Sequence, residues 1–127
     1  VFEVTLCGIG LGLWLAGYRP VVSIYPRLDF LMIAANQLVN HLDKWAAMGA
    51  GNPKVIIRTM PGSIAPIYSG PQHSQDHTEA LRLLCPHITV LKITQPEHIY
   101  SAYQRAVEDP GPFIVIEAPP KRMGYEG

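Results

Sequence analysis

Two histidines in a loop-forming segment have the spacing of a metal-binding pair. His73 and His77 are four positions apart, which on a helix would place both imidazoles on one side, where they could chelate zinc. A zinc protease would also carry a glutamate directly after the first histidine as general base, and Ser74 stands there instead. A zinc hydrolase therefore stays an alternative, while a serine hydrolase is weaker still because no GxSxG turn surrounds Ser69 or Ser74.

An acidic residue precedes a long apolar segment near the amino terminus. Glu3 is followed by residues 4–16, which stop short of the ~20 residues needed to cross a bilayer and lack the basic start of a secretory signal. We expect a helix buried on more than one face, with its glycines where another backbone passes close. Their GxGxG spacing does not fit the GxGxxG dinucleotide fingerprint. From the sequence alone, Glu3 is a carboxylate favourably placed in the first turn of a helix.

Length and composition limit the classes of protein that remain. A chain of 127 residues fits one domain, and 10 basic against 10 acidic residues leave no basic stripe for nucleic acid. The chain is 48% hydrophobic and only 16% charged, which favours an oligomer, whose partner covers part of the apolar surface, over a lone monomer. We expect no membrane partner. Cys7 and Cys85 stand far apart and form neither a disulfide framework nor a thiolate zinc site, so we expect a cytoplasmic protein.

Hydrophobic periodicity and turn residues predict alternating helices and strands. The expected order is a helix at 4–16 ended by Gly17, a strand at 20–25, a helix at 30–48 capped by Asp29, a strand at 54–59, a loop at 61–75, a helix at 78–84, a strand at 87–93, a helix at 97–107 and a strand at 113–117. This order predicts an α/β fold of three layers, with a mostly parallel sheet and helices on both faces. We expect one domain over residues 1–117 and a tail or linker at 118–127.

The loops at one edge of that sheet are the expected place of function. Ligands of parallel sheets bind beyond the carboxyl ends of the strands, here after Tyr25 and Thr59. The loop at 61–75 is rich in glycine and proline, as in loops that are shaped to carry a site.

Five short sequence motifs occur in the same order and at the same spacing as in a known protein family. They are Glu3 before a glycine-studded helix, AGYRPVV at 16–22, DF at 29–30, NQLVNHLDKW at 36–45 and QHSQ at 72–75. Together they resemble the beta subunits of pyruvate and branched-chain 2-oxoacid dehydrogenases. The resemblance implies the thiamine-diphosphate-binding fold, and within it the transketolase-like pyrimidine-binding domain.

The resemblance also implies roles for individual residues. Glu3 would bond a ring nitrogen of the aminopyrimidine of thiamine diphosphate and so activate the cofactor. His73 would face the thiazolium and the 2-oxoacid substrate as proton donor or charge stabiliser, a task suited to an imidazole near neutral pH. Phe30 would pack against the pyrimidine, and Tyr25 would lie near another wall of the pocket. His77, like His41, His87 and His98, is expected to be an ordinary polar residue.

Other features imply that the site is shared between chains. The sequence contains no GDG followed by asparagine, the signature with which this family binds Mg²⁺ and diphosphate, so both are expected on an alpha-type partner chain, in a homo- or hetero-oligomer. Ser23 replaces a usual acidic residue and residues 63–69 replace a glycine-rich run, which leaves the identity of the 2-oxoacid open. The expected function is a pyrimidine-binding subunit or fragment of a 2-oxoacid dehydrogenase, incomplete alone. The alternative is a non-catalytic remnant kept for assembly.

Overall fold

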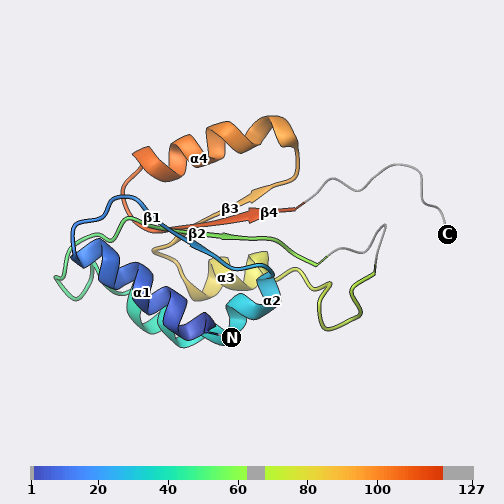
Figure 1. Ribbon diagram of the computed structural model, residues 1–127, viewed down its shortest axis with the longest axis horizontal. Coiled ribbons are helices and arrows are strands. Elements are labelled where there is room, and N and C mark those ends of the chain that lie inside the picture. The colour runs from blue at the N-terminus through green and yellow to red at the C-terminus, as the bar shows by residue number, and fades with distance from the viewer. Residues whose placement is uncertain (1, 63–67, 119–127) are drawn as a thin grey trace.

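The sheet of this protein has four strands, all parallel. A computed structural model describes residues 2–62 and 68–118. Within them, β1 (Val21–Ile24), β2 (Val55–Thr59), β3 (Thr89–Ile93) and β4 (Phe113–Glu117) are arranged in the order β1-β2-β4-β3 (Figure 1). Ile56 of β2 pairs with Val22 of β1 and with Phe113 of β4. β4 lies inside the sheet and is apolar along nearly its whole length, as expected for a parallel strand covered on both sides.

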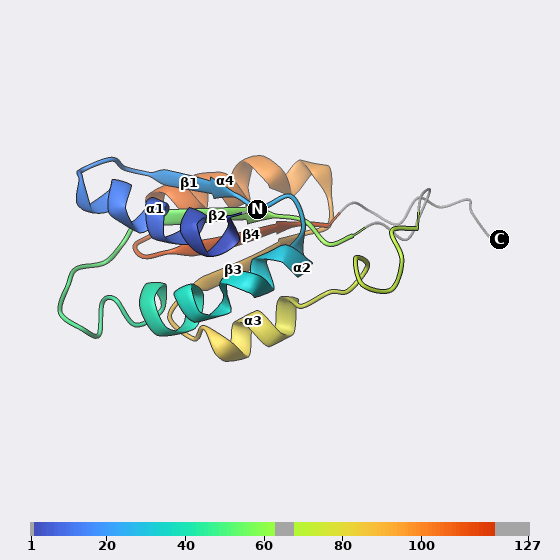
Figure 2. The same cartoon turned by 60° about the horizontal axis from the view of Figure 1, so that its bottom comes forward.

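Helices cover both faces of the sheet. On one face lie α1 (Glu3–Leu15), α2 (Leu28–Leu31) and α3 (Thr78–Leu84), and on the other lies α4 (Ile99–Glu108) (Figures 1 and 2). A 3₁₀ segment at Met32–Ala34 (η1) directly follows α2, and a π-helical segment at Gln37–Leu42 (η2) comes next in the chain. A second 3₁₀ segment at Pro96–His98 (η3) directly precedes α4. Each face has its own buried apolar cluster, and the one under α4 contains Ile56, Ala106 and Phe113. The predicted three-layer α/β class is therefore confirmed.

The first helix packs on one face only. Its buried residues are Glu3, Cys7, Gly10, Leu11 and Trp14. Its outer side is apolar but exposed, with Ile9 52% and Leu15 60% accessible. The expectation of a helix buried on more than one face is thus wrong for the described chain, because no described element packs on the outer side.

Only one of the three helical glycines is a point of close approach. A Cβ on Gly10 would lie 2.8 Å from Oγ of Ser23, so β1 passes close to α1 there. A Cβ on Gly8 or Gly12 would meet nothing within 4 Å, and the expectation fails at these two positions. Gly17 ends α1 with a φ of +99°, as predicted.

The second helical segment differs from its prediction. It begins at Leu28, one residue before the expected cap Asp29, and its helical turns change from α to 3₁₀ to π before it ends at Leu42. Its start is fixed by a tertiary bond, since the Leu28 amide donates to the Met60 oxygen at 2.8 Å. At its other end Asp43 is buried and accepts a hydrogen bond of 2.7 Å from the His87 amide. These long-range bonds decide where the helix begins and ends.

The two cysteines are free and buried. Burial, and secondarily the other thiol, raises the pKa of Cys7 to about 11, and burial with the nearby Asp43 charge does the same for Cys85. Both side chains therefore pack as protonated apolar groups.

Among residues 2–62 and 68–118, no helix has the length and apolar character that a bilayer span requires. The replaced run at 63–69 lies mostly outside the described residues, as does the predicted tail beyond Ala118. The domain boundary at residue 117 stays a prediction.

Candidate functional site

The loops that follow β1 and β2 lie side by side at the carboxyl edge of the sheet. The Tyr25 amide donates to the Arg58 oxygen at 2.8 Å, and the Leu28 amide donates to the Met60 oxygen at the same distance. The prediction that these two loops share one rim is confirmed. This is the edge at which parallel sheets bind ligands.

Glu3 is held in the first turn of α1 at this end of the molecule. Its side chain is almost buried, with the residue 9% exposed. The Tyr25 hydroxyl donates a buried hydrogen bond of 2.6 Å to the main-chain oxygen of Glu3. Burial, and secondarily the nearby Cys7, raises the pKa of Tyr25 far above its ordinary value, so the phenol keeps the proton that it donates.

Tyr25 itself is fully buried beneath Glu3. In the described structure it therefore supports the carboxylate-bearing turn from below. Its direct contact with a cofactor stays a prediction.

The structure brings Phe30 and His73 together. Their ring centroids are 5.4 Å apart at an interplanar angle of 62°, so the rings meet edge to face. Phe30 belongs to α2 and His73 to the loop before α3, 43 positions further along the chain. α1 packs against η1, which directly follows α2, and Figures 1 and 2 both place the amino end of α1 near α2. Glu3, Phe30 and His73 thus belong to the same end of the fold.

Asp29 is a member of this site that the sequence did not reveal. Its side chain is 9% exposed, and its oxygens lie 3.9 Å from Nδ1 of His73 and 3.7 Å from Nε2 of His77. Among the described residues, neither Asp29 oxygen nor Nδ1 of His73 has a hydrogen-bond partner. An aspartate before a predicted helix has the sequence signature of a helix cap, so the sequence did not predict that Asp29 lies beside two imidazoles.

His77 is a second member of this site that the sequence patterns did not reveal. It was expected to be an ordinary polar residue, yet its imidazole faces Asp29. The segment from His73 to His77 is not helical, so the two imidazoles do not meet through the i, i+4 geometry of a zinc-binding helix. What they share is the carboxylate between them.

The loop that carries His73 is fixed at its main chain. A Cβ on Gly62 would lie 1.2 Å from the main-chain oxygen of His73, so only glycine fits at this crossing. The guanidinium of Arg27 donates to the same oxygen at 3.4 Å. The loops after β1 and β2 therefore both contact the backbone of the histidine.

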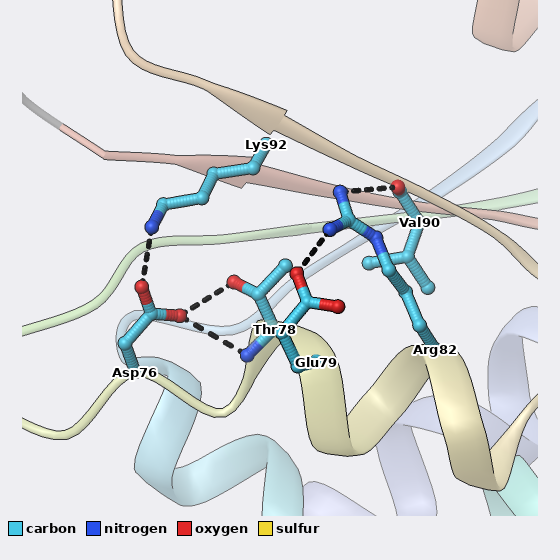
Figure 3. Close-up of polar contacts among 6 residues, drawn as sticks. All are labelled: Asp76, Thr78, Glu79, Arg82, Val90 and Lys92. Carbon is cyan, nitrogen blue, oxygen red and sulfur yellow. Dashed lines mark hydrogen bonds and ion pairs between the residues drawn. The ribbon is translucent and has the colours of Figure 1, made fainter.

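Asp76 anchors the other end of this loop (Figure 3). Its carboxylate accepts from the amide and the hydroxyl of Thr78, the first residue of α3, at 3.0 and 2.5 Å. It also accepts from Lys92 of β3. Burial alone would raise the pKa of Asp76, but the hydrogen bonds from Lys92 and Thr78 outweigh it and lower the pKa to about 2. Arg82 adds a bond from α3 to the Val90 oxygen of β3 (Figure 3).

The fold and this rim define the class of protein. The family model described as transketolase, pyrimidine binding domain, matches residues 1–121, and the chain belongs to this family. The predicted family is thereby confirmed.

Within that class the chain is similar to pyruvate dehydrogenase beta subunits. It is 31% identical over 119 residues to the mitochondrial pyruvate dehydrogenase E1 component subunit beta-1 of Arabidopsis thaliana, covering 92% of this chain and 32% of the relative. It is 29% identical over 125 residues to the E1 component subunit beta of Rickettsia felis, covering 92% of this chain and 35% of the relative. The chain thus spans about a third of the length of these relatives.

Proposed function

We propose that this chain is the pyrimidine-binding part of a thiamine-diphosphate-dependent 2-oxoacid dehydrogenase of pyruvate dehydrogenase type, with Glu3 as the cofactor-activating carboxylate. The observation that carries the proposal is the placement of Glu3. It is nearly buried, its main chain is bonded by Tyr25, and it lies at the end of the fold that carries Phe30 and His73. Membership of the family and the similarity to E1 beta subunits support the same function.

The residues present fit the pyrimidine end of such a cofactor. Phe30 is only half buried and offers an apolar ring to a flat heterocycle, while Glu3 offers a carboxylate in surroundings dry enough to favour a shared proton. Thiamine diphosphate supplies, when bound, the carbon nucleophile and electron sink for decarboxylating a 2-oxoacid. Glu3 would hold a proton at a pyrimidine ring nitrogen, and His73 would pass or withhold a proton at the substrate.

The remaining half of the site is assigned to another chain. Mg²⁺ and the diphosphate would be held by an alpha-type partner subunit in an oligomer. What supports a protein partner is the outer face of α1, where Ile9 and Leu15 are more than half exposed and Gly8 and Gly12 are uncovered. Residence in the cytoplasm stays a prediction, and several relatives are named as mitochondrial.

The test is Glu3→Gln in the complex reconstituted with the partner that co-purifies. The amide keeps the shape of the side chain but cannot take up the proton, so turnover should fall by roughly 10²- to 10⁴-fold while assembly is unchanged. Glu97→Gln, at an exposed position of η3, is the matched control and should keep full turnover. Normal turnover of the Glu3→Gln complex would contradict the assignment.

The same preparation tests the assembly-only alternative. A non-catalytic remnant would form the complex without binding thiamine diphosphate, which calorimetric titration measures directly. A remnant also has no chemical reason to retain both Glu3 and His73, whereas the proposed enzyme requires both.

A further inference from the structure

We propose that Asp29 is a positioning residue whose carboxylate holds His73 and His77 together and fixes which ring nitrogen of His73 carries the proton. The role of Asp29 in catalysis rests on the proposed function. The placement of Asp29 between the imidazoles of His73 and His77, the clamp, is a property of this chain itself. The two imidazoles approach opposite oxygens of one carboxylate, His73 through Nδ1 and His77 through Nε2.

The burial of Asp29 is the first step of the argument. A carboxylate that is 9% exposed has lost most of its water, and a buried acceptor without a donor is costly. Among the described residues, no hydrogen bond reaches either of its oxygens. The two imidazole nitrogens at 3.7 and 3.9 Å are therefore the donors that the geometry offers.

Closing these contacts requires only a small movement. Hydrogen bonds between nitrogen and oxygen reach about 3.2 Å, so each gap exceeds that range by roughly 0.5 to 0.7 Å. Hydrogen bonds of catalytic groups are often long in unliganded sites and shorten when the ligand is bound. Asp29 belongs to α2 and His77 directly precedes α3, so rotation of the Asp29, His73 and His77 side chains would close the gaps without moving either helix.

The other charged groups nearby are already engaged. The Arg27 guanidinium donates to the main-chain oxygen of His73, leaving the imidazole to Asp29. Asp76 accepts from Thr78 and Lys92. Asp29 is thus the carboxylate within reach of both rings among the residues that the structure describes.

The clamp determines what His73 presents to a ligand. With the proton on Nδ1 directed at Asp29, Nε2 lies across the ring as the nitrogen free to exchange a proton. The edge contact with Phe30 restrains the ring plane at the same time. Asp29 would thereby act on catalysis through His73, and His77 would secure the far side of the same carboxylate.

The test uses the full chain and reads the tautomers of the histidines by long-range ¹H–¹⁵N spectra, at a pH about two units above the ordinary histidine pKa. In the wild type we expect the proton on Nδ1 of His73 and on Nε2 of His77. A carboxylate accepts from both rings, but a carboxamide has one acceptor oxygen. In Asp29→Asn, one of the two imidazoles should therefore change tautomer. In Asp29→Asn combined with His77→Gln, the single acceptor oxygen is left to His73, which should then be in the Nδ1 form.

The matched control is Asp43→Asn, since Asp43 is also a buried aspartate but, unlike Asp29, accepts a hydrogen bond from the His87 amide and not from this loop. It should lower stability and leave both tautomers unchanged. A wild-type His73 protonated on Nε2, or an Asp29→Asn spectrum with both rings unaltered, overturns the proposal. The wild-type spectrum decides even if the variant fails to fold. Because neither cofactor nor partner enters, a failure of the clamp is separate from a failure of the Glu3 assignment.

Discussion

Tyr25 and Glu3 are joined by a buried hydrogen bond of 2.6 Å, from the phenol to the main-chain oxygen, across 22 positions of sequence. The bond ties the first turn of α1 to the end of β1. The turn that carries the candidate catalytic carboxylate is therefore tied to the core of the domain, although Glu3 is only the second residue that the structure describes. Its position should respond to changes beneath it.

Replacing Tyr25 by phenylalanine should lower the free energy of unfolding by about 1 to 2 kcal/mol. The ring still fills its place in the core, but the Glu3 oxygen loses a buried donor. Urea denaturation measures the loss, and Tyr100→Phe is the control because Tyr100 is 79% exposed. Equal stability of the Tyr25→Phe chain and the wild type would mean that the bond contributes nothing.

Much of the fold could be predicted from sequence because strand signals are local. The β-branched run of β4 and the turn residues beside it indicate a buried strand whatever packs on it, and the predicted and observed bounds agree at Phe113–Glu117. α3 was likewise predicted at its observed bounds, Thr78–Leu84. Glu3, Phe30 and His73 were predicted as site residues from the family resemblance, and they lie at one end of the fold.

The parts that could not be predicted depend on contacts distant in sequence. Asp29 before an apolar helix has the same signature whether it caps that helix or faces two histidines more than 40 positions away. Gly8, Gly10 and Gly12 are alike in sequence, yet only the strand passing Gly10 makes it a close contact. Local sequence patterns therefore predict neither the contacts of Asp29 nor which of the three glycines is closely packed.

Those glycines give opposite expectations for alanine substitution. Gly12→Ala should raise the free energy of unfolding of the chain by about 0.5 to 1 kcal/mol, because the helix gains a better former and the methyl meets nothing within 4 Å. Gly10→Ala should lower it, because its methyl would lie 2.8 Å from Oγ of Ser23. Chemical denaturation of both variants checks the pair, and the same sign for both would refute the assigned packing.

Replacing Gly62 by alanine should displace the His73 loop and leave the sheet intact. Its methyl would overlap the His73 oxygen, at 1.2 Å, so one of the two loops must move. The imidazole signals of His73 should then shift as the ring leaves the edge of Phe30, while the amide spectrum of the strands stays dispersed. Gly8→Ala is the control with open space around it. Unchanged His73 signals in Gly62→Ala would show that the crossing is looser than described.

Asp76 should make stability fall in acid. Hydrogen bonds hold its pKa at about 2 in the folded chain, below the ordinary 3.8. A lowered pKa means that the contribution is complete above the ordinary value and is lost as pH falls through the folded one, here from about pH 5 to about pH 2. Because the side chain is 43% exposed, solvent screening keeps the effect below about 1 kcal/mol. Urea midpoints across that range should decline less in Asp76→Asn than in the wild type, whereas Glu97→Gln should keep the wild-type slope. Parallel curves for Asp76→Asn and the wild type would remove Asp76 as the anchor of the His73 loop.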